Sequence, residues 1–163
     1  MISDEIREMP VIAALQARDS SAVADAVMHA GQLAVYIDPA KVLDVCRYLK
    51  QEHQFTRLSA VTAVDWFPME PRFEVVYLLH SMERRNVRMR LKCRLHGAQP
   101  EIDSVTPIWR GANWYEREVF DLFGIVFRGH PDLTRIMMPD HWEGHPLRKD
   151  FPVYGQKYTY KDE

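Results

Sequence analysis

The nine residues from Val87 to Leu95 alternate between apolar and basic at every position. Successive side chains of a strand point to opposite faces, so this segment is predicted to be a strand with one apolar and one basic face. The segment before it, Arg72 to His80, is apolar at nearly every position, which predicts a strand buried on both faces. Because a polar turn around Glu83 to Asn86 separates the two segments, they are predicted to form a hairpin.

Two helices and two more strands are predicted before this hairpin. Val11 to Arg18 and Pro39 to Glu52 have apolar residues at helical spacing, and Asp38 is placed to cap the second helix. Leu33 to Ile37 and Leu58 to Trp66 are short runs typical of strands. The order of these elements indicates an α+β fold, with a mostly antiparallel sheet and helices packed on one side.

The length of the chain indicates one domain. It has 163 residues, 47% of them hydrophobic, which is enough for a single core. We expect residues 1–130 to form the α+β domain, including a helix at 114–123, and residues 131–163 to form an extended C-terminal arm. The arm is expected because Tyr154 to Glu163 follows a proline-punctuated segment and lacks apolar periodicity.

Charge, cysteine spacing and glycine spacing argue against several functions. A net charge of −2 offers no broad attraction for nucleic acid or anionic lipid. Cys46 and Cys93 form no CxxC pair, so they lack the spacing of an iron-sulfur or zinc site. The glycines form no nucleotide-binding motif. No apolar run approaches the ~20 residues that span a bilayer, and the acidic N-terminus does not read as a secretion signal.

The helix from Trp114 to Phe123 contains the most informative residues. Asn113 and Glu116 have the spacing of a capping box, and Gly124 is placed to end the helix in a left-handed conformation. Glu118 and Asp121 lie one turn apart. Two carboxylates at this spacing could act as an acid/base pair. The preferred interpretation is structural, because Arg117 is placed to neutralise Asp121 at i+4.

The segment from Gly111 to Pro152 resembles the signature region of the 30 kDa subunit of respiratory complex I. The resemblance rests on residues 116–118, residues 121–123, His130 and residues 144–150, all in register. It covers about a quarter of the chain strongly. Residues 59–65 and 72–77 resemble the family more weakly, and Thr134 stands where the family usually has a basic residue or proline.

This resemblance implies a structural subunit of a proton-translocating NADH:quinone oxidoreductase. The implied subunit is not itself catalytic and binds no cofactor, while FMN, iron-sulfur clusters and quinone are expected in partner subunits. The implied partners are subunits D, B and I. The implied location is peripheral, on the cytoplasmic face of the bacterial inner membrane, or on the matrix or stromal side in an organelle. Its implied role is to assemble and hold these neighbours.

The residues expected to carry this role belong to the family motif and to the interfaces. None is predicted to be catalytic, to bind a cofactor or to hold a metal. Aromatic residues of the arm, with Arg, are typical of interface anchors, and truncation after Pro139 is expected to abolish assembly but not folding. The predicted set is Glu116, Arg117, Glu118, Asp121, His130, Arg135, Trp142, His145, Arg148, Lys149, Asp150, Phe151 and Tyr154.

Three other functions remain open. A cluster at residues 130–145 could bind a metal in a stand-alone hydrolase, although Gly144 and Pro146 argue against a helix presenting His141 and His145 together. The basic face of Val87 to Leu95 could make the chain an adaptor for an acidic protein. The chain could also be the equivalent subunit of a membrane-bound hydrogenase, a coenzyme-F420-dependent oxidoreductase or the photosynthetic NDH complex.

Overall fold

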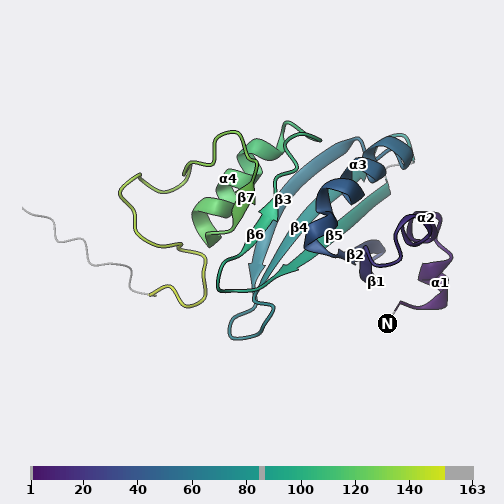
Figure 1. Ribbon diagram of the computed structural model, residues 1–163, viewed down its shortest axis with the longest axis horizontal. Coiled ribbons are helices and arrows are strands. Elements are labelled where there is room, and N and C mark those ends of the chain that lie inside the picture. The colour runs from purple at the N-terminus through teal and green to yellow at the C-terminus, as the bar shows by residue number, and fades with distance from the viewer. Residues whose placement is uncertain (1, 85–86, 153–163) are drawn as a thin grey trace, which may run out of the picture.

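The computed structural model describes residues 2–84 and 87–152 and consists of a sheet with helices on one side (Figure 1). The helices are α1 (Asp4–Arg7), α2 (Pro10–Arg18), the 3-10 helix η1 (Pro39–Lys41), α3 (Val42–Glu52) and α4 (Ala112–Phe123). The strands are β1 (Val23–His29), β2 (Gln32–Ile37), β3 (Arg57–Asp65), β4 (Phe73–Ser81), β5 (Val87–Leu95), β6 (Glu101–Asp103) and β7 (Val126–Arg128).

The main sheet has five strands in the order β1-β2-β5-β4-β3. All its neighbouring strands are antiparallel except β2 and β5, which are parallel. The hairpin of β4 and β5 is therefore confirmed, with Tyr77 opposite Leu91. Strands β6 and β7 form a separate parallel pair. The predicted α+β fold with a mostly antiparallel sheet is confirmed.

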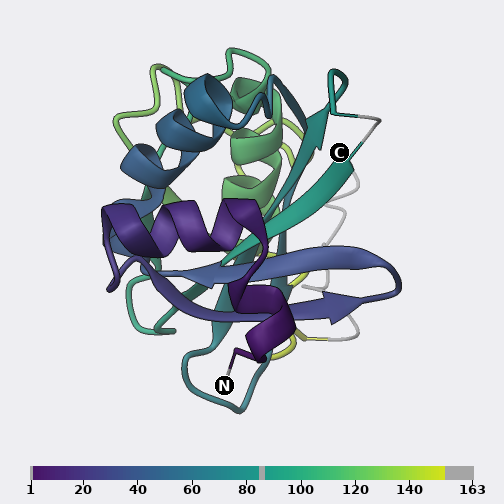
Figure 2. The same cartoon turned by 90° about the vertical axis from the view of Figure 1, so that its right-hand side faces the viewer.

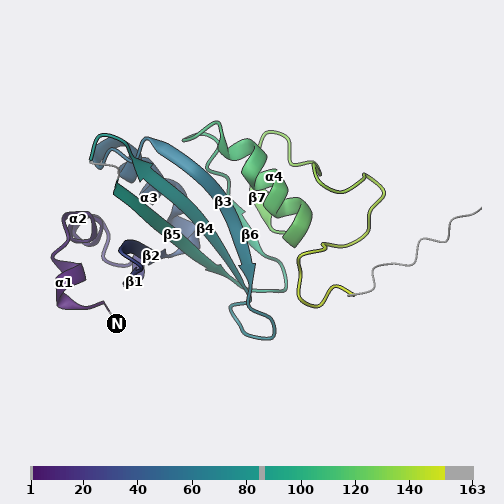
Figure 3. The ribbon, with the colours of Figure 1, turned by 180° about the vertical axis from the view of Figure 1, so that it is seen from behind.

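The helices leave one face of the sheet open. Helix α3 crosses the front of the sheet in Figure 1, and Figure 3 shows β3, β4 and β5 from behind with no helix in front of them. Figure 2 shows α1 and α2 beside the β1–β2 end of the sheet. Helix α4 packs against β3. No helix within the described ranges is long and apolar enough to cross a membrane.

The core lies between α3, α4 and the covered face of the sheet. The apolar stripe predicted for α3 is confirmed, because Val42, Val45, Cys46 and Leu49 are all buried. Strand β4 is buried at every residue but Leu78, whereas β5 is buried only at alternate positions. Both predictions for the hairpin are thus correct. Asp38 accepts a hydrogen bond from the Ala40 amide, as expected of a cap.

Four short or peripheral elements, α1, β1, β6 and β7, do not follow from the sequence pattern. Strand β1 is an edge strand whose last three residues are exposed, so it lacks a regular apolar alternation. Strands β6 and β7 have three residues each, and they exist because Ile102 and Phe127 meet within the core. Such pairings depend on tertiary contact rather than on local periodicity.

Candidate functional site

Helix α4 spans Ala112–Phe123, so it begins two residues before the predicted start at Trp114, and no side chain caps it at Gly111. The predicted capping box of Asn113 and Glu116 is therefore wrong. Glu116 points inward instead, where it accepts hydrogen bonds from Ser104 Oγ at 2.6 Å and from the Val105 amide at 2.7 Å. These long-range donors replace the local amide that a capping box would use. The C-terminal prediction is confirmed, because Gly124 has a φ of 72° and its amide bonds to the carbonyl of Phe120.

Glu116 is completely buried, and burial raises the pKa of this carboxyl to about 7 despite its two hydrogen bonds. His130 Nε2 lies 4.0 Å from Glu116 Oε2. The Asp132 amide donates to His130 Nδ1, so Nδ1 is an acceptor and Nε2 carries the proton that it donates to the carbonyl of Asn113 at 3.2 Å. The ring therefore fastens the segment after β7 to the first turn of α4.

Asp121, on the last turns of α4, binds the chain that follows β7. Its Oδ2 accepts from the amides of Ile136, Met137 and Met138 at 3.0, 2.7 and 2.9 Å. Its Oδ1 accepts from Arg135 at 2.6 Å. Burial alone would raise the pKa of this carboxyl, but the four hydrogen bonds outweigh burial and lower it. Asp121 is therefore an ionised anchor for a loop.

The predicted pairing of Arg117 with Asp121 is wrong. Arg117 donates to the carbonyl of Thr134 at 3.0 Å and to its hydroxyl at 2.7 Å, and its guanidinium lies 5.2 Å from the ring centroid of Trp114. The carboxylate of Asp121 is instead occupied by Arg135 and three backbone amides. Its donors therefore come from a distant part of the chain rather than from Arg117, one helical turn away. Thr134, where the chain departs from the family pattern, is thus the partner of Arg117.

Residues 145–148 are hydrogen-bonded to the C-terminal end of α4. His145 Nδ1 bonds to the carbonyl of Asp121 at 2.9 Å, and Arg148 Nε donates to the carbonyl of Phe123 at 2.6 Å. The Leu147 amide donates to the carbonyl of Leu122 at 3.0 Å. Burial lowers the pKa of both His145 and Arg148. These side chains satisfy carbonyls that a helix terminus leaves without partners.

A cluster of Asp65, Arg72 and Asp150 joins this segment to the sheet. Arg72 donates to Asp65 at 2.9 and 2.8 Å and to Asp150 at 3.0 and 2.6 Å. The Lys149 amide donates to Asp65 at 2.8 Å. The bonds from Arg72 and from backbone amides lower the pKa of Asp65 to about 2. Residue-type reasoning missed Asp65 and Arg72 as site residues, although both belong to the stretches that resemble the family weakly.

The remaining predicted site residues lie around this network. Glu118 and the side chain of Lys149 are exposed, and the rings of Trp142 and Phe151 are stacked with centroids 6.3 Å apart. Tyr154, with the rest of the C-terminal arm after Pro152, lies outside the described residues.

No group of three His, Cys, Asp or Glu side chains in residues 2–84 and 87–152 is arranged to hold a metal ion. His130 and His145 each direct ring nitrogens to backbone groups. Cys46 and Cys93 are separate, buried thiols, and burial raises the pKa of both. The polar side chains described above therefore link segments that are distant in the sequence.

Helix α4 and the residues hydrogen-bonded to it expose large apolar side chains. Trp114 on α4 is 63% exposed, Met137 beside Asp121 is 57% exposed, and Leu147 beside the end of α4 is 53% exposed. Because the amides of Met137 and Leu147 are hydrogen-bonded to α4, the backbone at these two residues is held in place. We call Trp114, Met137 and Leu147 the α4 surface. Exposed apolar groups among charged residues are typical of protein interfaces.

Comparisons with known proteins agree on one family. Residues 35–157 match the family described as respiratory-chain NADH dehydrogenase, 30 Kd subunit. The chain is 45% identical over 142 residues to the C subunit of NADH-quinone oxidoreductase from Geobacter sulfurreducens, and the match covers 86% of this chain and 87% of that protein. It is 49% identical over 134 residues to the mitochondrial NADH-ubiquinone oxidoreductase 30.4 kDa subunit of Neurospora crassa, covering 81% of this chain and 47% of that protein.

A solved structure has a similar fold. It is a trypsin-resistant fragment (1-134) of Nqo5, with a TM-score of 0.66 and 30% sequence identity. The likeness covers 77% of this chain and the whole of that fragment.

Proposed function

The chain belongs to the family of the respiratory-chain NADH dehydrogenase 30 kDa subunit, and from this premise we propose that it holds neighbouring subunits together without catalysing a reaction itself. As a subunit of NADH-quinone oxidoreductase it is part of complex I. We assign its role to the peripheral arm, on the cytoplasmic face of the membrane in bacteria. Its proposed neighbours are subunits D, B and I, which would carry the iron-sulfur clusters and the quinone site, with FMN elsewhere in the complex.

The observation that carries this proposal is the way α4 holds an apolar surface in place. Asp121 fixes the backbone of residues 136–138 with three hydrogen bonds, and Arg117 fixes Thr134 two residues earlier. An ionised carboxylate used in this way is fully occupied by donors. This full occupancy supports a structural role for Asp121, because a catalytic carboxylate needs an oxygen that is free to accept or release a proton.

A preformed surface favours assembly for an energetic reason. Ordering a flexible loop on binding costs conformational entropy, and a loop that is already hydrogen-bonded avoids most of that cost. Trp114 is an anchor of the kind found at interface centres, since a Trp buries a large apolar area with few rotatable bonds. Arg117, packed on the Trp114 ring, limits the orientation of that ring.

The proposal is tested with Trp114→Ala and Met137→Ala in the complete complex. Met69→Ala is a matched control, because Met69 is 55% exposed against 57% for Met137 but lies on the β3–β4 connection. We expect each α4-surface variant to reduce the amount of chain that co-purifies with subunits B and D, while Met69→Ala does not. The thermal unfolding of the isolated variants should change little, since surface substitutions usually cost within about 0.5 kcal/mol.

Normal recovery of the complex with the double variant Trp114→Ala, Met137→Ala would contradict the proposed role of the α4 surface. Loss of assembly with all three single variants alike would also contradict it, because the effect would then not belong to this surface.

A further inference from the structure

The basic stripe of β5 is divided into two halves by its neighbours. Arg88, Arg90, Lys92 and Arg94 all project from the open face of the sheet, because they alternate with the buried residues of the strand. The register places Glu74 of β4 opposite Arg94, and His80 opposite Arg88. Only one end of the stripe therefore has a carboxylate opposite it.

The half of the stripe near Glu74 is neutralised within the fold. Glu74 is buried, and its two oxygens lie 2.8 Å from Lys92 Nζ and 2.8 Å from Arg94 Nε. Lys92 also lies over the ring of Tyr36, and Arg94 over the ring of Trp66. These two cations are already bound by groups of this chain.

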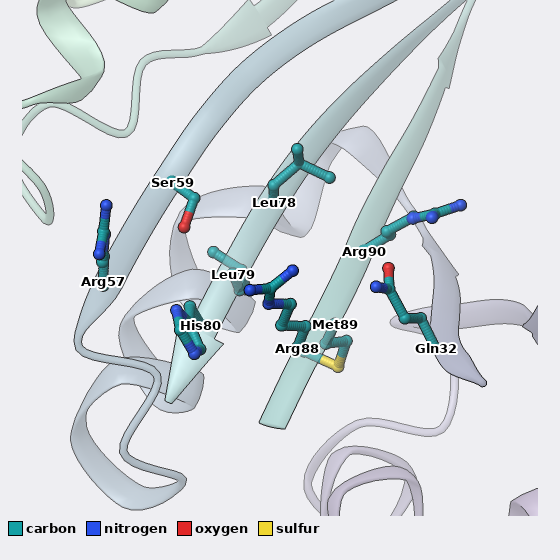
Figure 4. Close-up of a pocket in the computed structure, with 9 residues that line it drawn as sticks. All are labelled: Gln32, Arg57, Ser59, Leu78, Leu79, His80, Arg88, Met89 and Arg90. Atoms are coloured by element: carbon teal, nitrogen blue, oxygen red, sulfur yellow. The ribbon is translucent and has the colours of Figure 1, made fainter. Parts of the chain in front are cut away.

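The other half surrounds a cavity of about 410 Å³ that opens on the same face. Figure 4 shows Arg57 from β3 and Arg88 and Arg90 from β5 around this cavity, with Leu78 of β4 between them. No Asp or Glu lines it, and none of the three arginines has an ion pair or side-chain hydrogen bond with any residue of 2–84 and 87–152. We call this region the arginine cleft.

A buried polar group also faces the arginine cleft. His80 is 9% exposed and lines the cavity, and its Nε2 has no hydrogen-bond partner within the described ranges. A buried nitrogen without a partner costs free energy, and such groups are rare in folded proteins. An acceptor entering the cleft would remove this cost if Nε2 carries the ring proton.

We propose that the arginine cleft binds an acidic segment of a partner protein, with carboxylates placed between Arg57, Arg88 and Arg90. Charge complementarity supports this occupant, because an Arg guanidinium pairs with a carboxylate through two parallel hydrogen bonds. Leu78, the half-buried residue of β4, gives the cleft an apolar contact for the aliphatic part of the segment. The inference rests on the proposed function only in taking the partner to be another subunit.

Two other anionic occupants fit the cleft less well. Single-stranded nucleic acid is bound by stacking bases on aromatic rings, and no Phe, Tyr or Trp of the described residues lines the cavity. An anionic membrane is a broad flat surface, and such surfaces attract clusters of four to eight basic residues rather than a small recess with apolar walls. Acidic side chains on a narrow segment match both the size and the lining of the cleft.

The proposal is tested in the assembled complex with a photo-crosslinking residue at Ser59, which lines the cleft. Thr62 is the control position, because it is an exposed residue of the same strand outside the cavity lining. We expect crosslinks from position 59, but not from position 62, to a segment of another subunit rich in Asp and Glu. The double variant Arg88→Gln, Arg90→Gln should lower the crosslink yield at least about tenfold, while Arg7→Gln, at an exposed position on α1, should not.

A binding assay with the full chain gives an independent measurement. A hexaglutamate peptide labelled with a fluorophore serves as the probe, and the arginine double variant should weaken its binding at least about tenfold relative to Arg7→Gln. Equal binding by the two variants would overturn the proposal. Crosslinks to lipid, to nucleic acid, to a basic or neutral segment, or to this chain itself would overturn it as well.

The two proposals fail in different ways. If Trp114→Ala leaves assembly intact but position 59 still crosslinks to an acidic segment, only the α4 surface is refuted. If assembly depends on Trp114 but position 59 gives no such crosslink, only the arginine cleft is refuted.

Discussion

At the scale of single residues, Glu116 makes stability depend on pH. Its folded pKa of about 7 lies above the ordinary value of 4.5, so the folded state holds a proton that the unfolded state has released between these values. The free energy of unfolding is therefore expected to fall by about 3 kcal/mol as pH rises from 4.5 through 7, and to level off above that. Burial is the main cause of the raised pKa, and His130 Nε2 lies 4.0 Å from the carboxyl.

Glu116→Gln is expected to remove this dependence. The amide oxygen can still accept from the Val105 amide, and no charge remains to be buried. Urea unfolding at pH 5 and pH 8 measures the effect, with Glu118→Gln as the control because Glu118 is exposed on the same helix. The variant should be more stable than the parent at pH 8 by up to about 3 kcal/mol. Parallel pH profiles for parent and Glu116→Gln would show that the carboxyl is not protonated in the fold.

Asp65 has the opposite effect on stability. Its folded pKa of about 2 lies below the ordinary value of 3.8, so its stabilising contribution is present above pH 4 and is lost as pH falls toward 2. Asp65→Asn should lower the free energy of unfolding at pH 7 by about 2 kcal/mol and should flatten the acid limb of the profile. Asp44→Asn is the control, because Asp44 forms an exposed pair with Arg47. An equal loss in both variants would contradict the role given to the Arg72 cluster.

At the scale of elements, the end of α4 positions the segment that follows it. A Cβ on Gly124 would lie 2.5 Å from atoms of both His145 and Arg148, and φ there is +72°. Gly129 has a φ of +75° with open space around it, so Gly129→Ala carries the same backbone strain without the clash.

We therefore expect Gly124→Ala to destabilise the chain more than Gly129→Ala does, by about 1 to 3 kcal/mol. Thermal unfolding measures the difference, and the amide NMR shifts of His145, Leu147 and Arg148 should change only in Gly124→Ala. Equal effects of the two substitutions would mean that strain at positive φ, rather than contact with the segment, decides the result.

The contacts of α4 show what a sequence pattern can and cannot predict. The sequence predicts strands β4 and β5 and helix α3 correctly, because their burial follows a local period. It does not predict the partners of Glu116, Arg117 and Asp121, because each is bound by residues 11 to 18 positions away. Spacing within a helix suggests only the neighbours on the next turn. The family resemblance marks these residues as important without identifying their contacts.

The expected boundary between residues 130 and 131 remains a prediction. Residues 131–150 are tied to α4 and to Arg72 by the contacts described above. A chain truncated after Pro139 would lack the bonds that Lys149 and Asp150 make to Asp65 and Arg72. We therefore expect the truncation to reduce stability as well as assembly, so point substitutions on the α4 surface separate the two effects better.

At the scale of the whole molecule, burial is distributed unevenly across the sheet. The central strand β4 is buried on both faces although no helix of the described residues covers the open side; there Lys92 and Arg94 of β5 lie against Glu74 of β4. The edge strand β3 packs on α4, whereas the other edge strand, β1, has β2 as its one hydrogen-bonded neighbour among the described strands and exposes Val27 and Met28. Local opening should therefore be easiest at β1.

Hydrogen exchange of the isolated chain tests this distribution. Amides of β4 and β5 should exchange last, at rates set by global unfolding, because both strands have hydrogen-bonded neighbours on each side. Amides of β1 should exchange first among the strands of the main sheet, since an edge strand with few buried side chains opens without disrupting the core. Protection of β1 equal to that of β4 would contradict this order and would show that the sheet opens only as one cooperative unit.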